Sequence, residues 1–305
     1  MTTYVPDRTP DRRRTIRIKR SALLQNKLEE IDRPSIKIAE TRDELEQAFS
    51  LVYREYLKLG YIKEPNPSEM YLSICHILPE TAVFIFKSYL TVICTLTQIF
   101  DSKLFGLPMD DLYHEELNAL RNASRKLVEL SALATPKEAR WRNVFMYLCQ
   151  AMYWYAIYKN VNDLCIMVNP KHVDFYKTIF LFEDLGPEKY YPNVGAPAVA
   201  LRLDLDDIQG KLREKYGTLD FDCDMYSFFH RVTTTQLTPS GGEDLLVKKN
   251  GMLDADTVRY FFIEKTNVLE KATPDQMNYI RSIYPGLNRT TGEFCNILKL
   301  YHFQG

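Results

Sequence analysis

The chain has 305 residues, of which 46% are hydrophobic and 26% are charged, and its formal net charge is -1. A near-neutral chain of this size offers no overall positive field for nucleic acid, and no apolar run is long enough to span a bilayer. The six cysteines have no C-x-x-C spacing and stand in apolar surroundings, so we expect reduced thiols, no disulfide and no metal site. The N-terminus lacks a hydrophobic signal-peptide core, which predicts a cytoplasmic location.

Residues 1–34 are polar, with a basic cluster from Arg12 to Arg20 and little apolar periodicity. We expect this segment to be a mobile arm outside the folded domain. A basic arm of this kind is either simply solvated or a contact for an acidic protein or a membrane surface. Peripheral membrane contact through the arm therefore stays open.

The folded part is predicted to begin with a strand at 36–39. The sequence Thr-Arg-Asp-Glu at 41–44 is a capping box, so a helix should follow it and end at Gly60. We expect a second helical stretch at 68–76. Two β-rich runs then fill 81–101 and predict an antiparallel hairpin.

The middle of the chain alternates helix and strand. A loop at 101–112 separates the hairpin from a helix predicted at 114–123. A strand at 126–134 then precedes a long helix at 137–159, which is apolar on most sides and should therefore pack against a sheet.

A strand, a sharp turn and a short helix follow in immediate succession. Residues 164–168 form a continuous apolar run, as expected of a strand covered on both faces. Asn169 and Pro170 stop this strand, because proline disfavours helix at the residue before it, and a helix can begin near Lys171. Tyr176 on this helix is therefore expected near the carboxyl end of the strand.

The last strands and a helical region complete the pattern. We predict a strand at 180–183, a loop at 186–197 and a final strand at 198–203, which together complete a domain spanning 35–207. Residues 208–305 consist of amphipathic helical segments with no recognisable catalytic or metal constellation. They are predicted to be a helical C-terminal extension.

The strand at 126–134 carries an unusual polar pair. Glu129 and Ser131 point to the same face of the strand because side chains alternate, and apolar neighbours fill the other face. A buried carboxylate is costly unless it is paired or used. Glu129 is therefore either an ion-paired or solvent-edge residue or a catalytic one.

These segments resemble known acyltransferase motifs. The order strand, N-x-x-x-x-x-F-Y helix and strand resembles the last motif of the Gcn5-related N-acyltransferases, whose helix tyrosine faces the leaving thiolate. The sequence E-x-S-x-L-A resembles the acyl-homoserine lactone synthases and, more closely, the FeeM-like long-chain N-acyl amino acid synthases. The second resemblance covers roughly 35–204 and rests on YREYLKLGYI, HILPETAVF, DSKLFGLPMDDLY, VELSALA, VNPKHVDFY and APAVALRL. It implies an α/β (α+β) Gcn5-related fold with a mixed central sheet flanked by helices.

Differences in sequence from these relatives indicate which substrates, and in particular which acyl donor, the chain uses. The lactone synthases carry arginines where this chain has Val52 and Ala132, which argues against S-adenosylmethionine as a substrate. Ordinary acetyltransferases place a glycine-rich loop near the coenzyme A pyrophosphate, whereas the corresponding loop at 135–143 contains no glycine. The side chains of this loop could still hold the single phosphate of an acyl carrier protein's phosphopantetheine. The candidates are Lys137, Arg140 and Arg142, for which a solvated helix start is the alternative.

The resemblance implies attack of an amino acid's α-amine on a fatty acyl thioester, without a tightly bound cofactor and with acyl carrier protein or acyl-coenzyme A as donor. Glu129 would position or deprotonate the ammonium, and Tyr176 would face the departing thiolate. Backbone N–H groups around Leu133 and Ala134 would receive the carbonyl oxygen, and Ser131 would assist orientation. A thioester intermediate on a cysteine is not favoured, because no base is placed beside a thiol.

The free amino acid needs a partner for its carboxylate. Arg54 offers planar bidentate geometry, although an exposed helix-surface arginine is the alternative. Tyr56, Asp101 and His172 are further candidates, and His172 could equally be a hydrogen-bond partner at the helix start. Rival functions are an acyl-homoserine lactone synthase, a coenzyme A-dependent N-acetyltransferase, and a non-catalytic module that binds acyl chains or a partner.

Overall fold

A seven-stranded mixed sheet forms the centre of the molecule. The computed structural model describes residues 31–140, 144–219, 223–230 and 252–289. Neighbouring strands are antiparallel, except that β4 and β5 are parallel. The strand order is β1-β2-β3-β4-β5-β7-β6. The bounds are β1 (Pro34–Ile38), β2 (Ala82–Ser88), β3 (Thr91–Phe100), β4 (Leu127–Ala134), β5 (Asp163–Val168), β6 (Glu183–Tyr191) and β7 (Ala196–Asp204).

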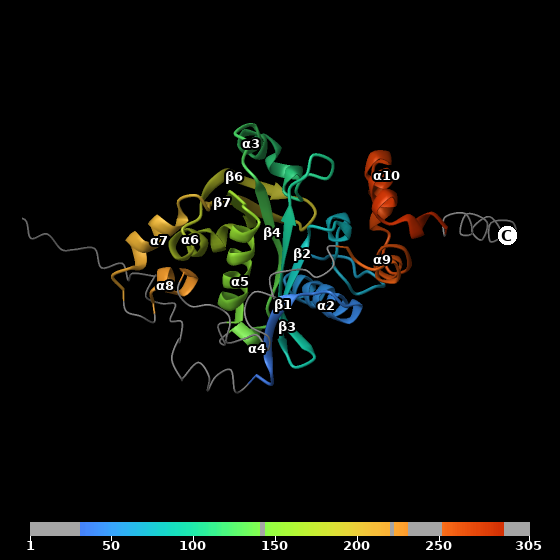
Figure 1. Cartoon of the computed structure of the whole chain (residues 1–305), viewed down its shortest axis with the longest axis horizontal. Helices are drawn as coiled ribbons and strands as arrows, with labels where there is room; N and C mark the ends of the chain where they lie inside the picture. The colour runs from blue at the N-terminus through green and yellow to red at the C-terminus, as the bar shows by residue number, and fades with distance from the viewer. Residues whose placement is uncertain (1–30, 141–143, 220–222, 231–251, 290–305) are drawn as a thin grey trace, which may run out of the picture.

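Helices cover both faces of the sheet (Figure 1). One face carries α5 (Val144–Tyr158), α6 (Pro170–Ile179), α7 (Ile208–Tyr216) and α8 (Met225–His230). The other face carries α2 (Arg42–Lys58), α9 (Ala255–Arg259) and α10 (Pro274–Ile283). The remaining elements are η2 (Ile74–Ile77), α3 (Asp110–Asn122), α4 (Lys137–Arg140), η4 (Tyr260–Glu264), η5 (Val268–Lys271) and η6 (Pro285–Arg289). The predicted fold class, a mixed sheet flanked by helices, is confirmed.

The first strand, the helix after it and the hairpin form as the sequence predicts. Thr41 caps α2, since its Oγ1 accepts the N–H of Glu44 at 3.3 Å. The side chain of Glu44 in turn accepts the N–H of Glu40 at 3.2 Å. In a strict capping box it would instead accept the N–H of the N-cap residue, Thr41. Gly60 takes the left-handed conformation, with φ +74°, just past the helix end.

The helix predicted at 68–76 is wrong, because only a single turn, η2, forms there. The preceding residues bond locally through side chains: Asn66 donates to the carbonyl of Met70 at 3.1 Å and accepts from the hydroxyl of Ser68 at 2.8 Å. Such side-chain bonds compete with helix formation. Tyr71 donates its N–H to Phe49 of α2 at 3.1 Å, which ties the segment to a neighbouring helix instead.

The strand predicted at 180–183 and the loop predicted at 186–197 are also wrong, because β6 runs through Glu183–Tyr191. Gly186 and Pro187 suggested a loop, but an edge strand tolerates proline, and the pairing with β7 shifts register on both sides of Gly186. A Cβ at Gly186 would lie 2.7 Å from the ring of Tyr113. Glycine is therefore required at this position for β6 to lie against α3.

The predicted long helix at 137–159 corresponds to α4 and α5, with residues 141–143 between them outside the described part of the chain. The helix predicted at 114–123 begins earlier, at Asp110. Of the predicted N-terminal arm, only residues 31–34 are described. None of the described helices is both long and apolar enough to cross a membrane.

The described helices beyond residue 204 divide between the two faces of the sheet. Helices α7 and α8 join the hydrophobic core beside α5, whereas α9, η4 and α10 join the core beside α2. Phe49 of α2 and Phe261 of η4 meet edge to face with ring centroids 5.2 Å apart. The boundary predicted at residue 208 stays a prediction, but the helices beyond it are packed as parts of the core.

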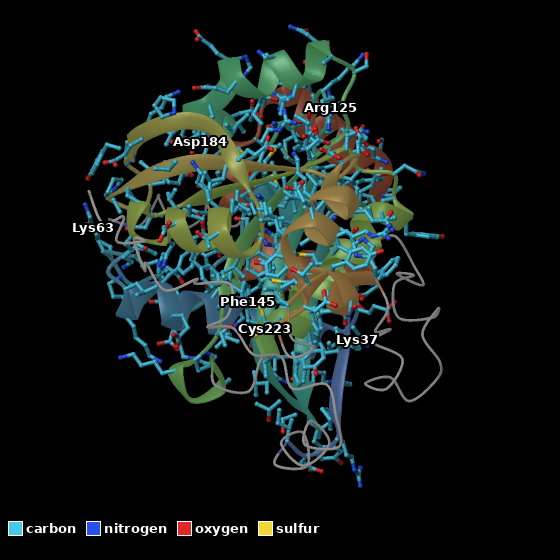
Figure 2. The ribbon with its side chains drawn as sticks, turned by 90° about the vertical axis from the view of Figure 1, so that its left-hand side faces the viewer. Lys37, Lys63, Arg125, Phe145, Asp184 and Cys223 are labelled. Carbon is cyan, nitrogen blue, oxygen red and sulfur yellow. The ribbon has the colours of Figure 1, made fainter. Side chains whose placement is uncertain are left out.

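A cluster of ion pairs joins the starts of β4 and β5 to the end of β7. Asp163 is completely buried and accepts hydrogen bonds from Arg125, which also donates to Asp204 at 2.8 Å. Arg202 Nε approaches Asp163 at 3.3 Å. Burial nevertheless raises the pKa of Asp163 above its ordinary value, against the lowering effect of both arginines. Arg125 lies toward the end of the molecule that carries α3, away from Lys37 (Figure 2).

Candidate active site

The two parallel strands at the centre of the sheet separate halfway along their length. Backbone pairing between β4 and β5 ends at Glu129 and Cys165, although β5 continues beside β7 to Val168. On its other side, β4 contains a bulge, since two of its residues, 132 and 133, lie opposite one residue of β3. Ala132 has φ +54°, an uncommon conformation for a residue with a Cβ. The sheet therefore opens beside the part of β4 that follows Glu129, where β4 no longer pairs with β5.

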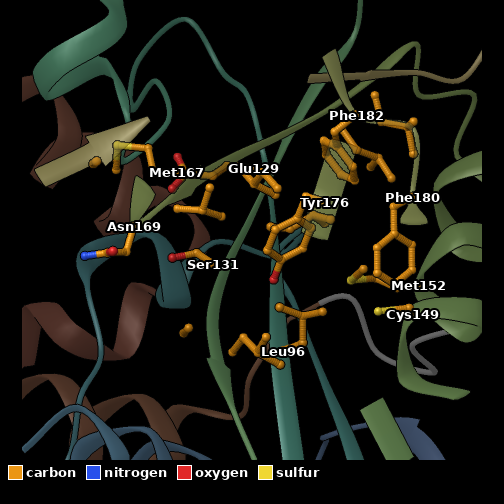
Figure 3. Close-up of a pocket in the computed structure, with 18 of the residues that line it drawn as sticks. Leu96, Glu129, Ser131, Cys149, Met152, Met167, Asn169, Tyr176, Phe180 and Phe182 are labelled. Carbon is orange, nitrogen blue, oxygen red and sulfur yellow. The ribbon is translucent and has the colours of Figure 1, made fainter. Parts of the chain in front are cut away.

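A cavity of about 220 Å³ occupies this opening and is lined by residues from both faces of the sheet. Its polar end is lined by hydroxyl, amide and carboxyl groups from Tyr56, Tyr61, Tyr71, Glu129, Ser131, Asn169 and Tyr191. Its apolar end is lined by side chains that include Leu96, Phe145, Cys149, Met152, Phe180, Leu212 and Phe229. Figure 3 shows Tyr176 between the two ends, with Glu129, Ser131 and Asn169 to one side and Cys149, Met152 and Phe180 to the other.

Glu129 is the buried carboxylate of the cavity, with 2% of its surface exposed. Its Oε2 accepts the N–H of Met109 at 2.8 Å. Burial raises the pKa of Glu129 to about 8, and the nearby carboxylates Asp110 and Asp111 raise it further, against the lowering effect of the Met109 N–H. A carboxyl group with such a pKa titrates close to neutral pH, and its ionised form is a stronger base than an ordinary carboxylate, which suits a general base.

The loop that supplies the Met109 N–H is held by an arginine. Arg121 of α3 donates to both oxygens of Asp101, at 2.8 Å each, and to both oxygens of Asp110, at 2.7 and 2.6 Å. Asp110 Oδ2 also accepts the N–H of Leu107 at 2.7 Å. Asp101, predicted as an acceptor ligand, thus lies in this ion-pair network and does not line the cavity.

Tyr176 lies on α6, and the turn before this helix forms as predicted. Asn169 caps the helix by accepting the N–H of Lys171 at 3.2 Å, and Pro170 occupies the first helical position. The ring of Tyr176 packs at 5.8 Å from that of Phe182. Burial raises the pKa of Tyr176, so its hydroxyl stays protonated at neutral pH and can donate a hydrogen bond or proton.

The structure brings together only some of the predicted site residues. The cavity is lined by Tyr56, Glu129, Ser131, Leu133 and Tyr176. Ala134 is buried at the end of β4 but does not line the cavity. The predicted residues that are exposed and away from the lining are Arg54 on α2, Lys137 at the start of α4 and His172 on α6. The side chain of Arg140 and the whole of Arg142 lie outside the described part of the chain.

The sequence did not identify Tyr61, Tyr71 and Tyr191 as residues of the polar end. Tyr56, Tyr61 and Tyr71 form a cluster, with ring centroids 5.6 Å apart for the first pair and 4.9 Å for Tyr56 and Tyr71. Burial raises the pKa values of Tyr56 and Tyr71. Tyr61 stands inside the segment YREYLKLGYI, which could have indicated it, whereas Tyr71 and Tyr191 fall in segments whose secondary structure was predicted wrongly. No arginine, lysine or histidine lines the cavity among the described residues.

Comparisons with known proteins agree with this fold: the chain is an N-acyltransferase of the Gcn5-related type. More narrowly, residues 47–204 match the family model described as N-acyl amino acid synthase FeeM. The match extends over more than half of the chain, and the chain belongs to this family. It begins within α2 and ends with β7, so it includes every strand that lines the cavity.

Three solved structures illustrate the likeness. FeeM, an N-acyl amino acid synthase from uncultured soil microbes, is 27% identical with a TM-score of 0.51, over 59% of this chain and 95% of FeeM. The coenzyme A-dependent acyl-homoserine lactone synthase BjaI, solved with S-adenosylmethionine and isopentyl-coenzyme A, is 15% identical with a TM-score of 0.43, over 55% of this chain and 81% of BjaI. An N-acetyltransferase from Staphylococcus aureus Mu50 is 15% identical with a TM-score of 0.38, over 56% and 98% of the two chains. No curated protein sequence matches the chain.

Proposed function

We propose that the chain transfers a long-chain fatty acyl group from an acyl carrier protein thioester to the α-amine of a free amino acid, giving an N-acyl amino acid. One observation carries the proposal: a single cavity joins the buried carboxylate of Glu129 to an extended apolar region. The apolar region suits a fatty chain, because burying methylene groups there is favourable. The polar end offers hydroxyl and amide groups that can hold a small polar acceptor.

The reaction requires a neutral amine, because an ammonium has no lone pair to attack the thioester carbonyl. Glu129 would take the proton through Oε1, since Oε2 accepts the N–H of Met109. The amine nitrogen then bonds to the carbonyl carbon and loses its second proton to solvent, and the C–S bond breaks as the tetrahedral intermediate collapses to the amide. Tyr176 would give its proton to the departing thiolate and regain one from solvent.

The developing oxyanion needs donors at the point where the strands separate. The backbone around Leu133 and Ala134 lies at the bulge of β4, where N–H groups can face the cavity rather than β5. Ser131 lines the cavity between these residues and Glu129 and would orient the substrate through its hydroxyl. This arrangement would place the reacting carbonyl beside Tyr176.

Recognition of the amino acid would rely on neutral groups. The hydroxyl groups of Tyr56, Tyr71 and Tyr191 and the amide of Asn169 line the polar end and can donate to a carboxylate. Arg54 and His172 remain proposed acceptor ligands, but each would need the substrate or the chain to move toward it, because both are exposed outside the lining.

The proposal is tested by product analysis. The purified chain is incubated with palmitoyl-acyl carrier protein or palmitoyl-coenzyme A, together with the full set of proteinogenic amino acids and, separately, S-adenosylmethionine. An N-acyl amino acid detected by mass spectrometry with the carrier donor supports the proposal and identifies the acceptor. An acyl-homoserine lactone would contradict it, and absence of any product with either donor would favour a binding role.

Replacement of Tyr176 by phenylalanine is expected to lower kcat about 10²-fold, at the lower end for a proton donor because a thiolate leaves readily. The ring and its packing against Phe182 are retained, so the fold should not change. Steady-state kinetics would measure the effect. Tyr155→Phe removes a hydroxyl from a buried tyrosine of α5 that does not line the cavity, and its kcat should match the wild type. Equal kcat in both variants would exclude Tyr176 as the donor.

Replacement of Lys137 by glutamate should raise KM for acyl carrier protein while leaving turnover of acyl-coenzyme A unchanged. The exposed Lys137 at the start of α4 is available to the phosphate or to an acidic carrier surface. Lys271→Glu makes the same charge change at an exposed residue of η5, on the other face of the sheet. Parallel KM measurements on both donors decide the matter, and equal effects on both would overturn carrier recognition by Lys137.

A further inference from the structure

Two helices that lie beyond the family match close the apolar end of the cavity. Ile208 and Leu212 of α7 and Phe229 of α8 line that end, and these side chains are buried, with 2%, 3% and 5% of their surface exposed. The match to the synthase family ends at residue 204. The end wall of the cavity is therefore built by a part of this chain that the family match does not reach.

Hydrogen bonds hold this wall in place against α5 and α6. The hydroxyl of Tyr216, at the end of α7, donates to the carbonyl of Ile179 at 2.8 Å, and the side chain is completely buried. The side-chain amide of Gln150 donates to the carbonyl of Phe228 in α8. The hydroxyl of Tyr153 and Nε2 of His230 lie 3.0 Å apart. Each helix of the wall is thus tied to a helix that packs on the same face of the sheet, α7 to α6 and α8 to α5.

Aromatic packing makes the wall stiff. The ring of Phe229 lies edge to face with Tyr153 at 5.3 Å and with Phe180 at 6.4 Å, and both of these residues line the cavity themselves. Moving one ring would require the others to move, because protein interiors are close-packed. An acyl chain that reaches the wall therefore meets packed side chains rather than open solvent.

We propose that α7 and α8 form a fixed stop that sets the longest acyl chain the enzyme accepts, with Phe229 and Leu212 as the residues that determine this length. The inference rests on the proposed transfer of a fatty acyl group. Each methylene that fits in the apolar end favours binding, roughly fourfold per group. The first one that does not fit must displace packed side chains, which is unfavourable. The preference should rise with chain length and then fall abruptly.

Two substitutions with opposite effects test the stop. Phe229→Ala removes a ring from the wall, so the preferred donor should become longer, with kcat/KM for the longer chain rising about tenfold or more relative to wild type. Leu212→Phe adds volume at the same end, so the preferred donor should become shorter. The measurement is kcat/KM across acyl carrier protein donors from octanoyl to behenoyl in even-numbered steps.

A matched pair of variants distinguishes an effect on the shape of the cavity from an effect on the stability of the fold. Phe229→Leu and Phe228→Leu remove the same groups from adjacent residues of α8, but Phe228, although completely buried, does not line the cavity. Only Phe229→Leu should shift the preferred chain length. Circular dichroism and thermal melting report whether each variant is folded, and the position of the length optimum does not depend on the fraction of active protein.

Failure of the stop and failure of the proposed reaction give different results. Dissociation constants for acyl-pantetheine thioethers of the same lengths are measured alongside turnover. If the wild type transfers no acyl group, the proposed reaction is wrong, and the binding series alone decides whether the wall sets the length. An optimum that stays at the same chain length in Phe229→Ala and Leu212→Phe, in turnover and in binding, would overturn the inference.

Discussion

Replacement of Glu129 by glutamine is expected to lower kcat by about 10²–10⁴-fold, the range typical of a lost general base. Glutamine keeps the size of the side chain, and its amide oxygen can still accept the N–H of Met109. The amide cannot take a proton from the ammonium of the acceptor. The loss should therefore appear in kcat, measured at saturating donor and acceptor.

The pH dependence of the wild type provides a second measure of the same group. Because burial raises the pKa of Glu129 to about 8, its basic form appears only as the pH rises through that value. Turnover should therefore increase with pH through an apparent pKa near 8, and this step should be missing from the residual activity of Glu129→Gln. Ionisation of the substrate amine is common to both proteins, so the comparison isolates the carboxyl group.

The stability of the glutamine variant should move in the opposite direction to its activity. A carboxyl group whose pKa is raised in the folded state stabilises the fold below its unfolded pKa, and this contribution is lost as the pH rises through about 8. Glutamine has no charge to bury, so Glu129→Gln should melt at a higher temperature than the wild type in alkaline buffer. Glu44→Gln, at a buried glutamate paired with Lys37 and Lys87 outside the cavity, is the control and should retain turnover. Full activity in Glu129→Gln would remove Glu129 from the mechanism.

Replacement of Arg125 by methionine is expected to destabilise the fold by about 2–4 kcal/mol, because it leaves the buried Asp163 without its main partner. The value lies toward the lower part of the usual range because Arg202 stays within 3.3 Å of Asp163. Burial already raises the pKa of Asp163, and loss of Arg125 should raise it further. The deficit should therefore shrink in acid, where Asp163 takes up a proton.

Chemical denaturation at neutral and acid pH measures this effect. The control is Lys211→Met, which removes a cation from an exposed pair with Glu183 and should cost less than about 1 kcal/mol. If the two variants lose equal stability at neutral pH, burial of Asp163 does not determine the strength of its pairing. A deficit that grows in acid would also contradict the assignment.

The sequence was sufficient wherever local chemistry decides the structure. The strand, turn and helix around Asn169, Pro170 and Tyr176 form as predicted, because an asparagine cap and a proline at the first helical position act within a few residues. Alternation along β4 likewise predicted that Glu129 would be a polar group among apolar neighbours, and it is buried. These signals identified the middle of the cavity.

Features that depend on distant parts of the chain could not be predicted in this way. The bulge at Ala132 depends on how β4 meets β3, and β6 forms because an edge strand accepts Pro187. Tyr71 and Tyr191 reach the polar end from segments far apart in the chain. The closure of the apolar end by α7 and α8 depends on tertiary packing, and amphipathic periodicity alone indicated only that helices would form there.

The division of the C-terminal helices between the two faces has a consequence for the limits of the folding unit. A fragment restricted to residues 47–204 would lose β1 and the N-terminal turn of α2, leaving β2 with an unpaired edge. It would also lack Tyr216 and Phe228, which are completely buried on one face of the sheet, and Phe261, which is completely buried on the other. The apolar surface that these side chains cover would then be exposed on both faces. Such a fragment should aggregate through its open strand and bare faces. We therefore expect the cooperative folding unit to extend beyond both ends of the segment that matches the family.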